Sequence, residues 1–216
     1  MVRSADLLVM YDSVQFTKRD WRNRNLIWTP KGNHWLTVPV LTKGRYSQPI
    51  NETLVVDTSW TKSHIGVIRN AARLHHTDPS IIADLERLFD KLSQLEHLSA
   101  INLYSIQWLS ERLGINTQIL TDEVFHFEGS PSKRLADIAQ ESGASVYVTG
   151  TAARNYLDPT EFGLRQIEIE WVDYCKLPID PTLPSAGTEL SIIDTILRHG
   201  FDGGRMLSTF GPSDHV

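Results

Sequence analysis

The chain has 216 residues, which is long enough for one good-sized domain with its own hydrophobic core. Hydrophobic residues make up 41% of the chain and charged residues 22%, and both fractions are ordinary for a globular protein. The net charge of −5 argues against binding to nucleic acid or to an anionic membrane through the global field, because those partners usually require a basic surface. Local basic patches remain compatible with this balance.

Compartment and membrane attachment are inferred from what the sequence lacks. Cys175 is the single cysteine, so no intramolecular disulfide can form, which fits a reducing compartment. No apolar stretch approaches the ~20 residues that span a bilayer, and the first residues do not resemble a signal peptide. We therefore expect a cytoplasmic protein without membrane insertion. Packing is the expected role of Cys175, because nothing nearby in the sequence would stabilise a thiolate.

The first third of the chain has β-prone patterns. Residues 7–11 predict a buried strand. Residues 25–29 and 34–40 flank four turn-forming residues, 30–33, and therefore predict a hairpin with a four-residue loop. The remainder of this third predicts a polar loop and then a short strand, at residues 42–50 and 54–56.

The middle of the chain predicts helices. Thr58 offers an N-cap hydroxyl to the first. Asp78 and Pro79 form a typical start for the second, and Gly114 suits the position just after the end of the third. Apolar residues recur at helical spacing throughout. The three predicted helices cover residues 60–74, 79–92 and 98–113.

Strands and helices alternate in the last third. Strands are predicted at residues 117–121, 145–149 and 167–172. Helices are predicted at 132–142, 160–164 and 189–199, the first closed by Gly143 and the last by Gly200, with a Pro-rich loop at 175–187. This alternation predicts an α/β fold with a parallel or mixed sheet covered by helices. We expect one domain over residues 1–202 and a flexible tail over 203–216.

The first candidate binding site is the basic segment, residues 15–25. It places four cations and one indole within eleven positions, directly after the first predicted strand. Ligands in α/β folds bind beyond the carboxyl ends of strands, and Arg and Lys bind phosphate or carboxylate. The alternative is a solvated basic turn in which Trp21 is a packing anchor. The candidate binding residues are Gln15, Lys18, Arg19, Trp21, Asn23, Arg24 and Asn25.

Two further basic turns are weaker candidates. The second follows the strand at 145–149, where Arg154, Asn155 and Tyr156 could clamp an anion and orient a polar ligand. Its alternative is an ordinary turn with Arg154 paired to Asp158. The third is the helix start at residues 130–134, where basic residues oppose the helix dipole and an anion nearby would explain them. Plain surface charge is the favoured explanation there.

The sequence contains few candidate residues for acid–base catalysis or metal binding. The eight histidines lack the spacing of metal ligands, so no metal site is expected. His64 is a candidate general base because the ordinary pKa of histidine lies near neutrality, although a satisfied or exposed histidine is the more common case. Trp28 and Trp35 are assigned to core packing before ligand stacking.

At these residues the chain resembles the WbqC-like family of bacterial proteins, which are often encoded among genes for O-antigen and other surface polysaccharides. The matching pieces keep the same order over nearly the whole chain. They are Asp6-x5-Asp12-x-Val14-Gln15-Phe16-x-Lys18-Arg19-x-Trp21-x-Asn23-Arg24-Asn25, then residues 35–40, Lys43-Gly44, Gly150-x3-Arg154-Asn155-Tyr156-Leu157, and Leu190-Ser191-Ile192-Ile193-Asp194.

The chain departs from the family pattern at its N-terminus. Family members usually begin with a strand that carries a Gln-Pro-x-Tyr-x-Pro-type motif and with a following helix, whereas this chain starts roughly where that helix ends. The resemblance therefore predicts that the first strand and its motif are missing. Their absence would leave unpaired backbone edges and remove any catalytic group that the motif holds.

The resemblance implies a transferase that modifies a nucleotide- or lipid-linked sugar in surface-polysaccharide synthesis, by transfer of an acyl or aminoacyl group such as glycine. Lys18, Arg19 and Arg24 would hold a diphosphate or carboxylate with Arg154 opposite them, and His64 or Asp12 would act as general base. One alternative is an ATP-dependent ligase or nucleotidyltransferase, and another is a non-enzymatic binding or scaffold protein. The expected partner is a small molecule, and the cofactor and oligomeric state stay open.

Overall fold

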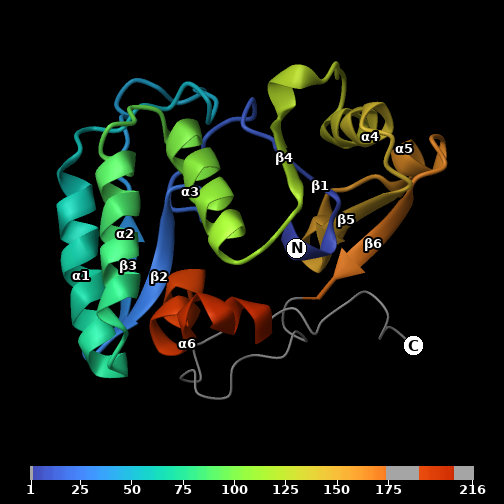
Figure 1. The fold of residues 1–216 in the computed structure, drawn as a ribbon. Coiled ribbons are helices and arrows are strands. Elements are labelled where there is room, and N and C mark those ends of the chain that lie inside the picture. Colours follow the sequence, from blue (N-terminus) through green and yellow to red (C-terminus); the bar gives the residue numbers. More distant parts are fainter. Residues whose placement is uncertain (1, 174–189, 207–216) are drawn as a thin grey trace. The chain divides into compact units, whose positions relative to one another are not determined.

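Residues 2–173 and 190–206 are described by the computed structural model, in which they form a mixed α/β fold (Figure 1). The chain divides into two units. Unit 1 comprises residues 1–11 and 117–178, and unit 2 comprises residues 12–116 and 179–216. The prediction of one domain over 1–202 stays a prediction. Cys175, the Pro-rich loop and most of the predicted tail lie outside the described residues.

Unit 1 contains two parallel strand pairs and short helices. Strands β1 (Leu7–Met10) and β4 (Gln118–Thr121) form one pair, and β5 (Val146–Gly150) and β6 (Glu168–Val172) form the other. Its core gathers small residues of α4 around the fully buried Phe162. The helical elements are α4 (Pro131–Glu141), α5 (Pro159–Gly163) and the 3-10 helices η1 (Val2–Ser4), η2 (Asp122–Val124) and η3 (Thr151–Asn155).

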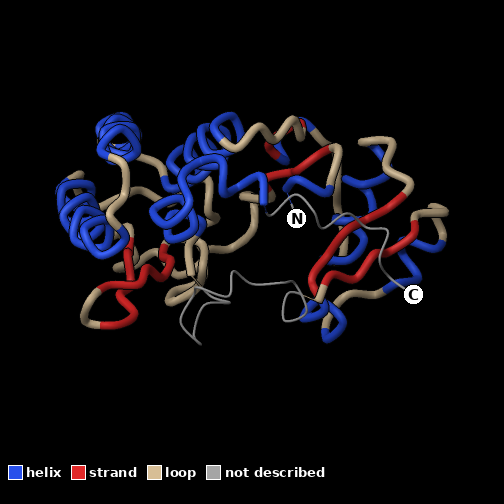
Figure 2. The backbone as a smooth tube through the Cα atoms, turned by 60° about the horizontal axis from the view of Figure 1, so that its bottom comes forward, coloured by secondary structure: helices blue, strands red, loops and turns tan. Residues whose placement is uncertain are grey.

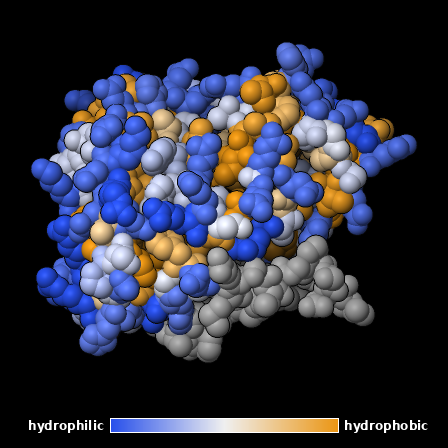
Figure 3. All heavy atoms as spheres, viewed as in Figure 1, coloured by the Kyte–Doolittle hydropathy of each residue, from blue (hydrophilic) through white to orange (hydrophobic). Residues whose placement is uncertain are grey.

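Unit 2 packs an antiparallel hairpin against helices. Ile27 is fully buried and belongs to the same core cluster as Ile68, Leu85 and Leu197, which lie on three different helices. The elements are β2 (Arg24–Thr29), β3 (Gly32–Thr37), α1 (Ser59–His75), α2 (Pro79–Leu92), α3 (Leu98–Arg112) and α6 (Ile192–Met206). In the space-filling view, the side chains over the outer side of α1 and α2 are mostly hydrophilic, as helices that cover a core require (Figure 3).

The strands form three separate pairs within the described residues (Figure 2). The predicted sheet is therefore present as two parallel strand pairs and one antiparallel hairpin, each with its own register of paired residues. The expected strand at 54–56 is reduced to isolated bridges, in which Leu54 pairs with His97 and Val55 with Val40. The segment is therefore paired on two sides without forming a ladder on either.

The hairpin turn differs from the expected four-residue loop. Thr29 pairs directly with Gly32, so only Pro30 and Lys31 remain in the turn. The Thr29 hydroxyl donates to the Gly32 carbonyl at 2.8 Å and accepts from the Lys31 N–H at 3.2 Å. Gly32 has φ +94°, a conformation that favours glycine. The threonine side chain thus closes a tighter turn than the polar run suggested.

Helix ends mostly follow the predicted capping residues. The Asp78 carboxylate accepts from the Ser80 N–H at 2.8 Å with Pro79 as the first helical residue of α2. Thr58 makes no side-chain cap; instead Asp57 accepts from the Ser59 N–H at 2.7 Å. Helix α6 continues to Met206 beyond the predicted stop, across a non-helical Gly200 with φ 70° and ψ −175°. The glycine ends one helical segment, and a second begins after it.

Asp194 holds α6 on the hairpin. Its carboxylate, fully buried, accepts from the Trp28 N–H at 3.1 and 3.3 Å. Next to it, the Ser191 N–H donates to the Leu26 carbonyl at 2.8 Å. Burial raises the pKa of Asp194 to about 6, against the lowering effect of the hydrogen bond from Trp28. The last segment of the family motif therefore joins helix to strand.

Candidate functional site

The basic segment forms a turn in unit 2 that is anchored at both ends. Phe16 is buried, and its N–H donates to the Gln48 carbonyl at 2.9 Å. At the other end the segment enters β2. Between these anchors the Thr17 hydroxyl donates to Asp20 at 2.7 Å and accepts from Arg22 at 2.6 Å, and Arg22 pairs with Asp20. One of the four cations is therefore neutralised inside the turn.

Arg24 is stacked on Trp35 of the neighbouring strand. The guanidinium carbon lies 4.1 Å from the Trp35 ring centroid, which is a close cation–π contact. Trp21 also contacts Trp35, and the centroids of the two rings are 5.1 Å apart. Trp21 is 50% exposed and Trp35 40%. The residues Trp21, Arg24 and Trp35 form what we call the aromatic–arginine cluster, an open surface with one cation and two indole rings.

The position of Trp35 corrects its assignment to the core. At the end of β3 Leu36 is buried while Trp35 and Thr37 on either side of it are exposed. Trp28, on the paired strand, is half-buried. Sequence reasoning missed Trp35 because burial is the default for tryptophan, although the alternation around Leu36 was available as a clue.

The other cations of the basic segment face solvent. Lys18 and Arg19 are exposed, and the Lys18 ammonium lies 6.0 Å from the centroid of the Tyr46 ring. Arg19 has φ 61° at the tip of the turn, and its carbonyl accepts from the Arg24 guanidinium at 2.5 Å. Within the described residues neither Lys18 nor Arg19 forms an ion pair. Both can therefore meet an anionic ligand without first breaking a salt bridge.

The three amides have mainly local roles. Gln15 donates to the Tyr46 carbonyl at 2.7 Å, and Asn23 donates to the Val38 carbonyl at 2.9 Å. The Asn25 side chain accepts from the Leu26 N–H at 2.8 Å. The carbonyl oxygen of the Asn23 side chain is buried without a protein partner. These contacts hold the backbone under the aromatic–arginine cluster, and a binding role for the amides stays a prediction.

Asp12 is buried where the chain enters unit 2. Its carboxylate accepts a hydrogen bond from the Ser99 hydroxyl in the first turn of α3. Its backbone carbonyl accepts from the Asn51 N–H at 2.9 Å. Asp12 therefore ties three segments together, which is a sufficient structural reason for an acid at this position. Its use as a general base stays a prediction.

His64 lies in the helical core. Its ring centroid is 4.9 Å from that of Trp60 and 6.0 Å from that of Phe89, and its Nε2 is 3.1 Å from the Thr37 carbonyl oxygen. Burial lowers the pKa of His64 to about 4, while the hydrogen bond with Thr37 acts in the opposite direction. The imidazole is neutral at pH 7, and its packing favours a structural role. A catalytic role for His64 stays a prediction.

The second candidate turn lies in unit 1. The Arg154 guanidinium carbon is 5.0 Å from the Trp171 ring centroid, and Arg154, Asn155 and Tyr156 are all exposed. Asp158 does not pair with Arg154. Its carboxylate instead accepts from the Thr160 N–H at 3.0 Å at the start of α5. The expected alternative of an Arg154–Asp158 pair is therefore wrong, and Arg154 forms no ion pair within the part of the chain that is described.

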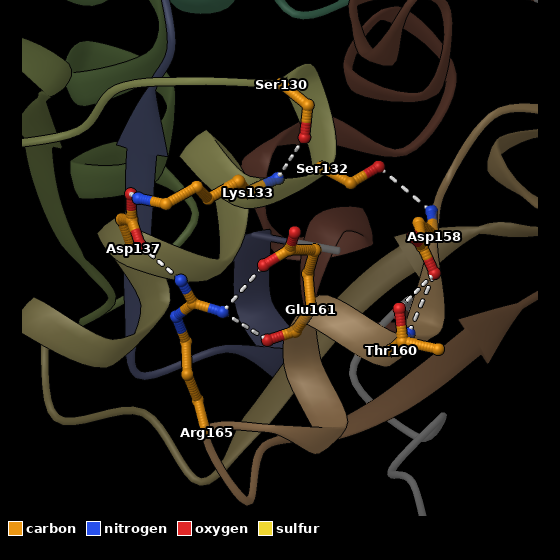
Figure 4. Close-up of polar contacts among 8 residues, drawn as sticks. All are labelled: Ser130, Ser132, Lys133, Asp137, Asp158, Thr160, Glu161 and Arg165. Carbon is orange, nitrogen blue, oxygen red and sulfur yellow. Dashed lines mark hydrogen bonds and ion pairs between the residues drawn. The ribbon is translucent and has the colours of Figure 1, made fainter.

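The third candidate turn is satisfied by its own neighbours (Figure 4). Ser130 caps α4, and Lys133 donates to Asp137 at 2.7 Å. Arg165 reaches the other oxygen of Asp137 at 2.6 Å and also contacts Glu161. Burial alone would raise the pKa of Asp137, but hydrogen bonds from Lys133 and Arg165 hold that pKa below its usual range. The basic residues here are explained by structure alone.

An open hollow of about 770 Å³ lies in unit 1 between residues 125–128 and one side of α4. Of the residues singled out in the sequence, Lys133 lines it. The His126 ring nitrogen Nδ1 is 3.1 Å from Glu141 at its edge, and the His126 N–H donates to the same carboxylate at 2.7 Å. The hollow lies apart in sequence from the aromatic–arginine cluster, which remains the candidate site of unit 2.

In the described ranges no group of three His, Cys, Asp or Glu side chains could hold a metal ion. No helix in these ranges is both long and apolar enough to cross a bilayer. The predicted site residues fall in both units: Arg154, Asn155 and Tyr156 belong to unit 1, and the others belong to unit 2.

The fold is mixed α/β, and the motifs in it are those of a family associated with surface-polysaccharide genes. The chain belongs to the WbqC-like protein family, whose model matches residues 1–206. It is 36% identical over 176 residues to the uncharacterized protein Rv1507c of Mycobacterium tuberculosis (strain ATCC 25618 / H37Rv), a match that covers 81% of this chain and 75% of that protein. No solved structure matches the chain.

Proposed function

We propose that the protein transfers an acyl or aminoacyl group, glycine among the candidates, to a nucleotide- or lipid-linked sugar in surface-polysaccharide synthesis. The aromatic–arginine cluster carries this proposal. Its two exposed indole rings offer flat apolar faces on which a sugar ring can lie, and Arg24 offers planar donors for a phosphate or carboxylate. Membership of the WbqC-like family supports the biosynthetic setting.

Arg24 is prepared for this role by its contacts. Trp35 holds the guanidinium plane, and the Arg19 carbonyl takes one of its donors at 2.5 Å. Its Nε is buried without a protein partner. A guanidinium that is already oriented loses less conformational entropy when a ligand binds. Lys18 and Arg19 would add charge at the edge, where a diphosphate or a carboxylate would otherwise meet only solvent.

The transfer itself requires few groups. The sugar amine or hydroxyl attacks the carbonyl carbon of the acyl donor, a new C–N or C–O bond forms, and the bond to the donor's leaving group breaks. A general base accepts the proton of the attacking group. We assign this role to Asp12, with His64 as the alternative. Most of the rate would come from positioning and from stabilisation of charge by the cations.

Ligand binding tests the proposal most directly. The purified chain is screened by thermal shift against nucleotide sugars, acyl-CoAs, free amino acids, and ATP with Mg²⁺, because a ligand of the folded state raises the melting temperature. Arg24→Lys keeps the charge but loses the planar stack, and should remove most of the shift. Lys31→Ser, in the turn of the same hairpin, is the matched control and should keep it.

The outcomes separate the alternatives. A shift with a sugar-linked ligand that depends on Arg24 supports the transferase. A shift with ATP and Mg²⁺ alone would support the ligase or nucleotidyltransferase instead. No shift with any class, from a folded sample, would favour a binding or scaffold protein. Arg154→Ala is tested separately, since Arg154 belongs to unit 1.

A further inference from the structure

Positive charge is concentrated in one stretch of the chain. Residues 13–51 carry seven Lys and Arg side chains and a single Asp, whereas the rest of the chain carries 14 Lys and Arg against 25 Asp and Glu. Charges act over about a Debye length, ~10 Å at moderate salt. Acidic side chains that lie farther than this from the stretch contribute little to its attraction for an anionic partner in direct contact with it.

The loop at residues 41–47 presents part of this charge on a fixed backbone. At its base the Leu41 N–H donates to the Leu54 carbonyl at 2.8 Å, and the Gln48 side chain donates to the Leu41 carbonyl at 2.7 Å. Within it the Arg45 N–H donates to the Thr42 carbonyl at 3.2 Å. We call these residues the Tyr46 loop. Its hydrogen bonds keep the exposed side chains in a defined arrangement.

The Tyr46 loop places two basic side chains between two apolar ones. Tyr46 is 81% exposed, and Leu41 is also exposed. Lys43 and Arg45, which lie between them in the sequence, are exposed and form no ion pair within the described residues. Lys18 approaches the Tyr46 ring from the basic segment, so the loop and the basic segment form a continuous surface. Such a surface exposes an aromatic ring for which no contact with another ring is found among the described residues.

We propose that the Tyr46 loop docks the protein on the surface of a bilayer that contains anionic phospholipids. The Lys43 and Arg45 side chains would contact the lipid phosphates. Tyr46, with an apolar ring and a polar hydroxyl, and Leu41 would enter the boundary between headgroups and acyl chains. Each cation held near an anionic leaflet strengthens binding, and a few apolar side chains add to it.

A bilayer fits this surface better than a nucleic acid does. Leu41 gains from burial at an acyl boundary but has little to gain against a phosphodiester backbone. The proposal concerns peripheral docking, so it is compatible with the absence of any membrane-spanning helix from the described residues. Docking also bears on the substrate of the proposed transferase. If the proposed function holds, a docked enzyme would take its sugar in lipid-linked form.

Co-sedimentation with vesicles tests the docking. The whole chain is spun with vesicles of phosphatidylcholine alone and with vesicles that also contain phosphatidylglycerol, in the absence of any sugar. We expect binding to the mixed vesicles only, and its loss when salt is raised to ~1 M, where the Debye length falls to ~3 Å. Equal binding to both vesicles, or none to either, would overturn the proposal.

Two variants and a matched control locate the surface. Lys43→Ser with Arg45→Ser should weaken vesicle binding roughly 25-fold, because each cation near the membrane counts for about a fivefold change. Tyr46→Ser should weaken it with a smaller change in salt dependence. Lys62→Ser with Arg73→Ser changes the net charge equally but on α1, where both side chains are exposed, and should bind as the unmodified chain does.

A competition experiment distinguishes membrane docking from binding to a nucleic acid. An excess of single-stranded DNA should not displace the protein from vesicles; displacement, together with DNA binding that the Lys43 and Arg45 changes abolish, would identify a nucleic-acid surface instead. If the protein does not bind vesicles but still shows the Arg24-dependent thermal shift, the docking proposal fails and the proposed function stands with a soluble substrate. Docking without any such shift would leave the membrane surface standing and remove the transferase.

Discussion

Unit 2 contains two aromatic clusters, one around a histidine and one around an arginine, and the two differ in exposure to solvent. In one, His64 is enclosed by Trp60 and Phe89. In the other, Arg24 lies on Trp35 beside Trp21, open to solvent. The enclosed ring has its pKa driven down to about 4 by burial, whereas the guanidinium stays available to an anion. Similar residue types thus lie in the core in one place and on the surface in the other, and only the exposed cluster is accessible to the ligand that we propose.

The largest difference should appear on truncation of one indole from each cluster. Trp60→Ala removes a buried side chain and should cost about 3–5 kcal/mol of unfolding free energy. Trp35→Ala removes a side chain that is 40% exposed and should cost about 1 kcal/mol. Urea unfolding of the two variants measures both values. Equal losses would mean that Trp35 is a core residue and would end the comparison.

His64 makes the enclosed cluster sensitive to acid. Its folded-state pKa of about 4 lies below the ordinary 6.5, so the unfolded state takes up the proton first as pH falls. Stability is therefore present above pH 6.5 and is lost as pH falls toward 4, by about 3 kcal/mol at most. His64→Gln, whose amide can still donate to Thr37, should flatten this loss. His34→Gln, a change at an exposed histidine, should keep most of the loss of stability at low pH.

Asp194 should contribute the opposite sign over nearly the same pH range, so its contribution and that of His64 largely offset each other in the unmodified chain and are separated by the two variants. Its folded-state pKa of about 6 exceeds the ordinary 3.8, so the folded state holds the proton more tightly. Stability should fall as pH rises from 3.8 through 6, by about 2–3 kcal/mol. Asp194→Asn keeps an acceptor for the Trp28 N–H and should remove this fall. Thermal melts across the range measure it, and an unchanged profile in the variant would refute the assignment.

The smallest effect is expected at the second open stack. Arg154 lies 5.0 Å from the Trp171 ring but is exposed, so Arg154→Ala should cost less than about 1 kcal/mol. Arg165→Ala, by contrast, leaves Asp137 and Glu161 without their shared cation and serves as the internal standard in unit 1. A larger loss from Arg154→Ala than from Arg165→Ala would show that the Arg154 turn is structural.

Helix starts and stops were predictable where a side chain acts within its own turn. Asp78 with Pro79 predicted the start of α2, and Gly114 predicted the end of α3, because a cap depends on residues a few positions away. The hairpin loop was predicted too long, since the Thr29 hydroxyl closes the turn through contacts that composition does not encode. The pairing of β1 with β4 joins segments more than a hundred residues apart and could not be derived from local pattern.

The candidate site was predicted in part for the same reason. The density of cations marked the basic segment, because composition is a local property. The contact of Arg24 with Trp35 and that of Lys18 with Tyr46 depend on tertiary structure, whereas the pairing of Arg22 with Asp20 is local. Tyr46 drew no attention in the sequence, since exposure at 81% is invisible there. His64 was chosen for its ordinary pKa, which burial then changed.

The exposure of Trp21 and Trp35 has a practical consequence for spectroscopy. Their indoles are open to small quenchers, whereas Trp60 is 5% exposed and should be shielded. The cations around the open pair should attract iodide and repel caesium, so fluorescence quenching by the anion should exceed quenching by the cation. A bound sugar or a lipid surface would then register as protection from iodide, which would make these two side chains built-in reporters of occupancy.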